Sequence, residues 1–516
     1  MQSSIINILG NWNPQLLREF RGRLKSRSVL AAISLSIIAQ LLLCLACLQH
    51  QTGSIKPRQW LDLWTILTWN IPWILFVLGS YYIVSDINQE EKRGTLNFIR
   101  LSPRPAEEIL LGKLLGVPIL PYITVGLTIP LHCIAALNAG IPLTFMVSFY
   151  GLLIASCTLC YSAVMLYGLG RNSKQGIVNI QATTAVSAAA IAWLLIFPIF
   201  MYGNLFLTWK PFTQVMNLLS LNNPPSIYWA YAEINQNLII SHGFTLGNIV
   251  IGITLIWSML LRRFRRPYGT VMSKRQSYLI LGYLEILFLG FCLSPTVTAS
   301  NEVLTGVSIF VFSLTVVLLI AIMFSVCPQR QALIDWSRYP SKHSTGWTAS
   351  KHFPSWISWV WADKSPAIFS MGIYVLMANA ILLPWTLISG LGSQQRIETI
   401  LAFIAVSNIL LIYGVLMQQI LAANIRNPNI WLVGGLTVWL VVPPLLLGFM
   451  GFVPEEIPFT TTLWTILGYP FWHFEQPSNI PFTVFGILIQ WLVLGGLLWQ
   501  FYQSLEDLQS LHSSDV

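Results

Sequence analysis

Long apolar stretches, separated by short polar segments, recur along the whole chain. Each stretch is long enough to cross a hydrocarbon core of about 30 Å as a helix. The stretches are continuous, whereas the strands of a membrane β-barrel would alternate between apolar and polar residues, so helical spans are favoured. The pattern predicts about twelve membrane-spanning helices. We expect them at residues 29–48, 64–85, 114–137, 143–169, 177–201, 245–261, 277–294, 302–327, 366–390, 397–424, 429–450 and 480–501.

The composition supports an all-α integral membrane protein. Of the 516 residues, 55% are hydrophobic and only 9% are charged, whereas soluble domains carry about 25% charged residues. A soluble fold with this composition would have too few polar groups to cover its surface. The composition therefore excludes an ordinary soluble globular protein.

The distribution of positive charge predicts the orientation. If the N-terminus lies inside, the cytoplasmic segments hold 24 of the 28 Lys and Arg residues, as the positive-inside rule requires. We therefore expect both termini in the cytoplasm. The same rule accounts for the net charge of +9, so nucleic acid is not expected as a partner.

The expected spans divide into two six-helix pseudo-repeats that follow a cytoplasmic N-terminus. In each half the longest inside loop follows the second span, and the longest outside loop precedes the sixth. Both halves begin inside, which is typical of parallel repeats related by an axis along the membrane normal. The expected parts are the N-terminus 1–28, a first unit 29–266 with loops 86–113 and 202–244, and a second unit 267–516 with loops 328–365 and 451–479.

The segment before the first span has the pattern of an interfacial amphipathic helix. Pro14 suits the first helical position, and Leu17, Phe20 and Leu24 fall on one face among basic residues. Such a helix lies on the membrane surface with its apolar face in the lipid. An alternative interpretation is a basic segment that only fixes the topology.

The cytoplasmic loop 86–113 is dense in charges of both signs and has a helical pattern of its own. An apolar patch over 95–101 follows a charged turn, and Pro103 ends that short helix. Glu108 lies in the first turn of the next helix, where an acidic side chain is favourable. A short amphipathic helix between two spans is a docking surface for a soluble partner. The alternative is an ordinary charged linker.

These residues resemble the first cytoplasmic loop of the ABC type-2 (ABC-2) permeases, the membrane subunits of many bacterial ABC exporters. The resemblance rests on a Glu-rich turn, a Gly-Thr-Leu sequence, a proline and a Gly-Lys pair at characteristic spacings. The matching residues are Glu90, Glu91, Arg93, Gly94, Thr95, Leu96, Pro103, Glu108, Gly112 and Lys113.

The resemblance implies a function and a set of partners. In the family this loop is a coupling helix that contacts a separate ABC ATPase subunit, so ATP would act through that partner rather than bind to this chain. The resemblance also implies a multi-pass protein of a bacterial plasma membrane. Membrane lipids would surround the chain, and either one chain forms the pathway or it pairs with a second permease chain.

Motifs for chemistry are missing from the sequence. No phosphate-binding P-loop precedes Lys113, and neither HExxH nor GxSxG occurs. The seven cysteines lie almost entirely in apolar stretches, where packing is a better interpretation than metal binding. We therefore expect no catalytic residues, no metal site and no directly bound cofactor, and we interpret the chain as a transport subunit rather than an enzyme.

Glu285 is the main candidate for a functional charge within a span. Acids at such positions often bind substrates or ions, although a paired or protonated structural acid is the alternative. Two other functions stay open: an ion-coupled secondary transporter in which Glu285 carries the coupling, and a membrane scaffold without transport. For an exporter, the otherwise apolar spans favour an amphipathic or lipid-like substrate.

Overall fold

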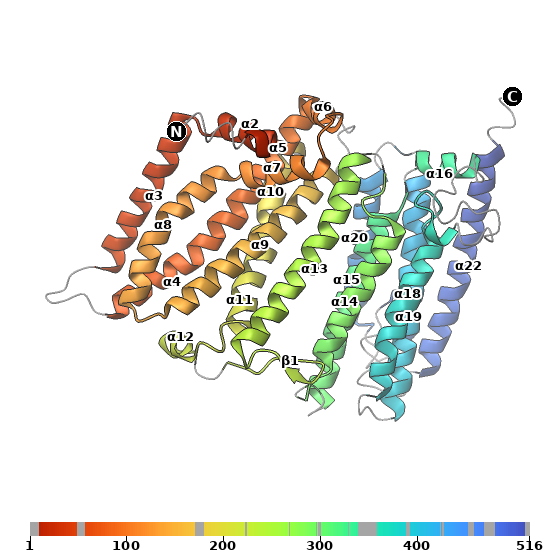
Figure 1. Cartoon of the computed structure of the whole chain (residues 1–516). Helices are drawn as coiled ribbons and strands as arrows, with labels where there is room; N and C mark the ends of the chain where they lie inside the picture. The colour runs from red at the N-terminus through yellow and green to blue at the C-terminus, as the bar shows by residue number, and fades with distance from the viewer. Residues whose placement is uncertain are drawn as a thin grey trace. The chain divides into compact units, whose positions relative to one another are not determined.

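The computed structural model divides into two compact units. Unit 1 comprises Met1–Ile227 and Glu233–Tyr268, and unit 2 comprises Tyr228–Ala232 and Gly269–Val516. Figure 1 shows that both units are built almost entirely of helices. The structure describes residues 10–510 except for 49–56, 171–179, 222–223, 268, 296, 298–300, 329, 339–358, 389–392, 424, 426–427, 453–458 and 469–479.

Unit 1 consists of long helices with short crossing helices at both ends. Its elements are α2 (Pro14–Arg23), α3 (Ser26–Cys47), α4 (Pro57–Trp73), η1 (Ile74–Leu78), α5 (Gly79–Lys92), α6 (Thr95–Arg100), α7 (Ala106–Gly116), α8 (Ile119–Asn138), α9 (Leu143–Gly170), α10 (Ile180–Ile191), η2 (Ala192–Ile196), α11 (Phe197–Leu207), α12 (Thr213–Leu218) and α13 (Leu238–Arg265). In Figure 1, α2, α6 and α7 lie at one end of the unit and α12 lies at the other.

Unit 2 has the same general character. Its helices are α14 (Lys274–Cys292), α15 (Asn301–Val326), α16 (Arg330–Arg338), α18 (Ile368–Ile388), α19 (Ser393–Ala422), α20 (Pro428–Phe449), α21 (Thr460–Ile466) and α22 (Ile480–Ser510). Parts of the expected loops 328–365 and 451–479 lie outside the described residues. The rest of those loops includes α16 and α21.

Ten helices in the described part of the chain are long and apolar enough to cross a membrane. They are Ser26–Cys47, Pro57–Lys92, Ile119–Asn138, Leu143–Gly170, Thr184–Leu207, Leu238–Arg265, Ile309–Val326, Ile368–Ile388, Arg396–Ala422 and Ile480–Leu505. The protein is therefore an all-α, multi-pass membrane protein. At the other two expected spans the structure has the helices α14 and α20, which are not among the ten, so twelve spans stay a prediction.

The second span of unit 1 contains a π-helical turn. Residues Ile74–Leu78 form this turn between α4 and α5, directly after Pro72. π turns occur mostly as single turns inserted into longer α-helices. The hydroxyl of Tyr161 donates to the carbonyl of Leu75 over 2.8 Å. A Cβ on Gly79 would lie 2.2 Å from that hydroxyl, so glycine is required for this contact.

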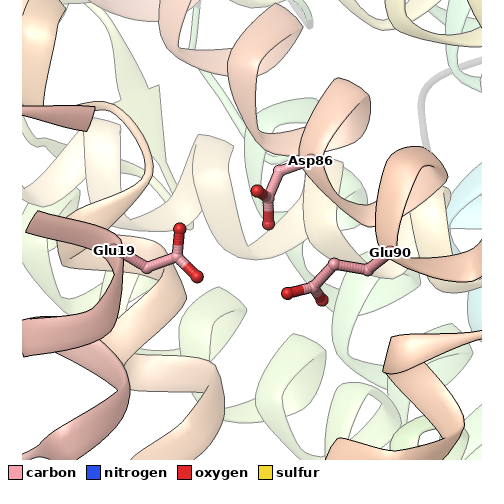
Figure 2. Close-up of side chains that lie close together, drawn as sticks. All are labelled: Glu19, Asp86 and Glu90. Atoms are coloured by element: carbon pink, nitrogen blue, oxygen red, sulfur yellow. The ribbon is translucent and has the colours of Figure 1, made fainter. Parts of the chain in front are cut away.

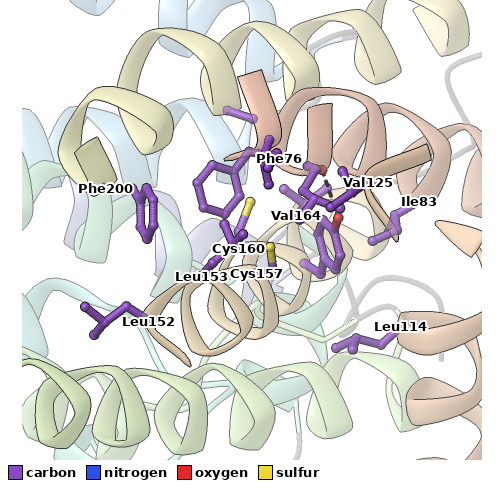
Figure 3. Close-up of a cluster of buried hydrophobic side chains, with 14 of the residues drawn as sticks. Phe76, Ile83, Leu114, Val125, Leu152, Leu153, Cys157, Cys160, Val164 and Phe200 are labelled. Atoms are coloured by element: carbon purple, nitrogen blue, oxygen red, sulfur yellow. Dashed lines mark hydrogen bonds between the residues drawn. The ribbon is translucent and has the colours of Figure 1, made fainter. Parts of the chain in front are cut away.

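A continuous apolar core holds unit 1 together (Figure 3). Phe76 of η1 and Phe200 of α11 meet edge to face with ring centroids 5.2 Å apart. Cys157 and Cys160 of α9 are buried free thiols within the same core. By contrast, only 6% of the most apolar part of α3 is buried. Its leucines therefore form an outward surface suited to lipid.

A two-residue β-hairpin is a local departure from the expected helices. Tyr228–Trp229 pairs with Ala232–Glu233, and the turn places Ala230 and Tyr231 at positive φ angles. Two-residue hairpin turns need such angles, but sequences that form them are usually rich in Gly or Asn, and this turn has neither. The amides of Ala230 and Tyr231 donate to the carbonyls of Gly290 and Leu293 at the end of α14, which holds the hairpin in place.

Candidate functional site

A buried lysine lies at the centre of an ionic cluster formed by the 86–113 segment and α2. The Nζ atom of Lys113 is 2.7 Å from Oδ2 of Asp86 and 2.7 Å from Oε2 of Glu90. Oε1 of Glu19 is 3.7 Å away, and the Lys113 side chain is only 3% exposed. Figure 2 shows the three carboxylates turned toward a common centre from α2 and α5. The cluster thus joins α2, α5 and α7.

Two arginines of α2 balance the remaining negative charge. Arg18 contacts Oε1 of Glu90 at 2.8 Å. Arg23 contacts Oδ1 of Asp86 at 2.5 Å and Oε2 of Glu19 at 3.4 Å. Three carboxylates therefore face three cationic side chains, and this balance suits a cluster that is largely removed from water.

The cluster shifts the pKa values of two of its members. Burial alone would lower the pKa of Lys113, but the charges of Asp86, Glu90 and Glu19 outweigh burial and raise it. Burial raises the pKa of Glu19, and the opposing effect of Lys113 does not cancel that increase. Lys113 is therefore held in its charged form at neutral pH.

The three carboxylates lie close enough together to suggest a metal site. The ammonium group of Lys113, however, already lies within ion-pair distance of all three. A lysine in this position supplies the positive charge that a metal ion would otherwise provide. The residues therefore fit an internal ion-pair cluster better than a metal centre.

Two glycines allow α2 to pack directly on α7. A Cβ on Gly112 would lie 2.7 Å from Oδ1 of Asn13, and a Cβ on Gly116 would lie 2.7 Å from Cβ of Glu19. Asn13 caps α2 by accepting a hydrogen bond from the amide of Leu16 over 2.9 Å. Its side-chain amide donates to the carbonyl oxygen of Glu108 over 2.7 Å. The Gly-Lys pair of the motif therefore supplies both close packing and the central charge.

A tight turn at Gly94 connects α5, which carries two of the cluster's acids, to the short helix α6. Gly94 has a φ angle of +73°, which is in the left-handed region that favours glycine. The hydroxyl of Thr95 donates to the carbonyl of Glu90 over 3.2 Å. Leu96 and Ile99 point into the core of unit 1. The inner side of α6 is thus held by both apolar and polar contacts.

Two exposed apolar side chains lie on the outer side of α6 and at its C-cap, Leu101. Phe98 is 79% exposed and Leu101 is 85% exposed. Between them in sequence, the guanidinium of Arg100 lies 5.7 Å from the ring centre of Phe264 in α13. At the start of α7, Glu107 pairs with Arg265 of α13 at 2.8 Å. Phe98 and Leu101 are here called the α6 outer face. The contacts of Arg100 and Glu107 with α13 hold the segment that carries them in place.

The ten residues of the sequence motif separate into two groups. Four of them are buried, namely Glu90, Leu96, Gly112 and Lys113. The others are exposed or partly exposed, namely Glu91, Arg93, Gly94, Thr95, Pro103 and Glu108. The buried group anchors α6 and packs α2 on α7, and Glu90, Leu96 and Lys113 are each no more than 6% exposed. The roles in partner contact inferred from the resemblance stay predictions.

Sequence reasoning did not select Asp86 and Glu19, which supply two of the three carboxylates. Phe98 and Leu101 belong to the predicted apolar patch over 95–101, but they were not among the residues assigned to partner contact. The four-residue spacing of Asp86 and Glu90, which places both on one side of a helix, was the available signal. The same spacing relates Gly112 and Gly116. No local signal indicated that Glu19 would meet them.

Glu285, the other predicted site residue, is fully buried in α14 of unit 2. It is remote in sequence from the ionic cluster and belongs to a different unit. In the described part of the 328–365 loop, α16 turns Leu333, Ile334 and Trp336 inward. Comparisons with known protein families, curated proteins and solved structures found no match to this chain.

Proposed function

We propose that this protein is the membrane-spanning permease subunit of an ATP-driven ABC exporter. A separate ATPase subunit would hydrolyse ATP and contact the protein at α6. The observation that carries the proposal is the α6 outer face. Phe98 and Leu101 are exposed on a helix whose opposite side is fixed to the buried ionic cluster. Exposed apolar side chains on a fixed helix suit docking to a soluble partner.

The proposed coupling uses the connections of α6 within unit 1. Through Gly94, α6 follows α5, which is the end of the 36-residue helix Pro57–Lys92. After α6, the chain enters α7, which leads into the span α8. Lys113 ties α7 to α5 and to α2. A displacement of α6 by a partner would therefore act on two spans and on the N-terminal helix together.

The proposal also specifies an orientation, a membrane and a class of substrate. The end with α2, α6 and α7 would face the cytoplasm, where 24 of the 28 Lys and Arg residues would lie. The membrane would be a bacterial plasma membrane. The substrate would be amphipathic or lipid-like, because the spans offer mainly apolar surface.

The direct test is to purify the tagged protein in mild detergent and identify any ATPase that co-purifies. The doubly substituted Phe98→Asp/Leu101→Asp protein should fold normally and lose that ATPase, since both side chains are exposed and an acid on this face would oppose apolar docking. The control is Leu221→Asp, which changes a leucine that is 37% exposed beyond α12 and should retain the ATPase. Retention by the double variant, or no ATPase with folded wild type, would refute the proposal.

A further inference from the structure

The carboxyl group of Glu285 is enclosed in the helical core of unit 2. Its side chain has no solvent exposure. The Thr315 hydroxyl of α15 donates to Oε2 over 3.2 Å, whereas Oε1 has no hydrogen-bond partner among the described residues. Within the described part of the chain, one of the two carboxyl oxygens therefore lacks a hydrogen-bond partner.

No described cation accompanies this carboxyl group. Its helix packs against α15, α18 and the strand Tyr228–Trp229. Helix α18 has no charged residue, and the charged residue of α15 is Glu302, about 20 Å from Thr315 along the helix. Lys274, at the start of α14, has its Nζ bonded to oxygens of Trp359, Ser365 and Pro366. None of these groups can neutralise an ionised Glu285.

Within α14, the titratable side chains that follow Arg275 are Tyr278, Tyr283, Glu285 and Cys292, and none of them is a cation. From α18, the Tyr374 hydroxyl is bonded to Ser277 at 2.6 Å, about two helical turns before Glu285. The paired strand contributes the indole of Trp229, which donates to a backbone carbonyl of α14. A buried carboxylate without a cation is strongly unfavourable, whereas a protonated carboxyl is not.

A small cavity is also lined by Thr315. It has about 10 Å³ of space for a water molecule, which is room for about one water. Its polar lining comes from three helices: Thr315 of α15, Asn379 of α18 and Ser407 of α19. The Asn379 amide donates to the Ser407 hydroxyl over 2.8 Å. These groups can hold one water beside the threonine that contacts Glu285.

We infer that Glu285 is a proton-binding site in unit 2, whose carboxyl group exchanges its proton with water held in the cavity that Thr315 lines. The ligand is a proton, and Thr315 orients the carboxyl by donating to one oxygen. The inference goes beyond the proposed coupling function and does not depend on an ATPase partner. The inference can therefore be tested on the purified protein alone.

Labelling with the apolar reagent dicyclohexylcarbodiimide tests whether the carboxyl carries a proton. That proton moves to a carbodiimide nitrogen, the carboxyl oxygen adds to the central carbon, and an acyl shift gives a stable N-acylurea with no leaving group. We expect peptide mass spectrometry to find this adduct on Glu285 at neutral pH, and to find less of it under alkaline conditions. Glu285→Gln should remove the adduct, whereas Glu107→Gln, at an exposed ion-paired acid, should leave it unchanged.

Infrared difference spectroscopy provides a second measurement. At neutral pH, wild-type protein should show a protonated carboxyl band that is absent from Glu285→Gln. Thr315→Val removes the donor, so the band should persist at a higher frequency and exchange more slowly in deuterated water. This variant keeps the test usable if Glu285→Gln does not fold. The absence of both the adduct and the band from folded wild-type protein would overturn the inference, as would deuterium exchange that Thr315→Val leaves unaltered.

Discussion

The Nζ atom of Lys113 lies 2.7 Å from Oε2 of Glu90, in a position where the lysine side chain is 3% exposed. Both residues belong to the motif that resembles a coupling loop, yet they contact each other inside the protein. Their role in this structure is to hold the base of α6. The α6 outer face lies on the opposite side of the helix from the buried residues, and it is exposed to another chain.

Replacing Lys113 by Met should destabilise the protein strongly. The change would leave Asp86, Glu90 and Glu19 without their central cation, and removing one partner of a buried ion pair costs about 3–5 kcal/mol. We expect a clearly lower Tm in detergent. Arg104→Met, which breaks a largely exposed pair with Glu108 at 3.6 Å, should cost at most about 1 kcal/mol. Equal Tm values for the two variants would contradict the assigned role of Lys113.

The raised pKa of Lys113 predicts a specific loss of stability at alkaline pH. A lysine whose pKa is higher in the folded state stabilises the protein below its ordinary value of 10.5, and this contribution disappears as the pH rises through the folded value. Unfolding measured between neutral pH and pH values above 10.5 should therefore show a decline in wild-type protein. Lys113→Arg should reduce that decline, because a guanidinium stays charged. A decline of the same size in the variant would exclude Lys113 as its source.

Substitutions at glycine should distinguish packing of α2 on α7 from general helix effects. Gly116→Ala would place a methyl group 2.7 Å from Cβ of Glu19, so we expect lower stability and easier proteolysis of the N-terminal helix. Gly126→Ala in α8 has open space around its Cβ, and should be neutral or stabilising by about 0.5–1 kcal/mol. Limited proteolysis and thermal unfolding measure both effects. The packing described for α2 would be refuted if Gly116→Ala behaved like the control.

The two sides of α6 should respond differently to truncation. Leu96→Ala should cost about 2–5 kcal/mol, because the side chain is buried in the core of unit 1. Leu101→Ala should change stability by no more than about 0.5 kcal/mol and should weaken capture of an ATPase subunit. Thermal unfolding and co-purification, run on the same preparations, separate these effects. A stability loss at Leu101 without any effect on capture would contradict the proposed docking surface.

Much of the helical architecture could be predicted from hydropathy alone. The stretch that includes Val29 is apolar over a full span, and a helix in a membrane must satisfy its own backbone groups, so length and composition identify it. The hairpin at Ala230 and Tyr231 could not be predicted, because neither residue favours positive φ. The amides of the turn instead donate hydrogen bonds to carbonyls at the end of α14. Tertiary contacts of this kind cannot be predicted from the local sequence.

The candidate site was predictable only in part, for a similar reason. Loop 86–113 was recognisable because its charges and its helical pattern occur together within a short stretch. The inward direction of Leu96 and Lys113 depends on α2, whose Glu19 is distant from both in sequence. A motif indicates which residues recur together, but burial depends on the neighbours that the fold supplies.

The π turn at Ile74–Leu78 has a further consequence for the ionic cluster. Such a turn accommodates one residue more than the α-helical path around it, and one residue corresponds to a rotation of about 100° around a helix. If the same residues formed an unbroken α-helix, Asp86 and Glu90 would be rotated by about that angle and would face away from Lys113. The angular position of the two acids is therefore set two to three turns earlier in the same helix, by the π turn at Ile74–Leu78.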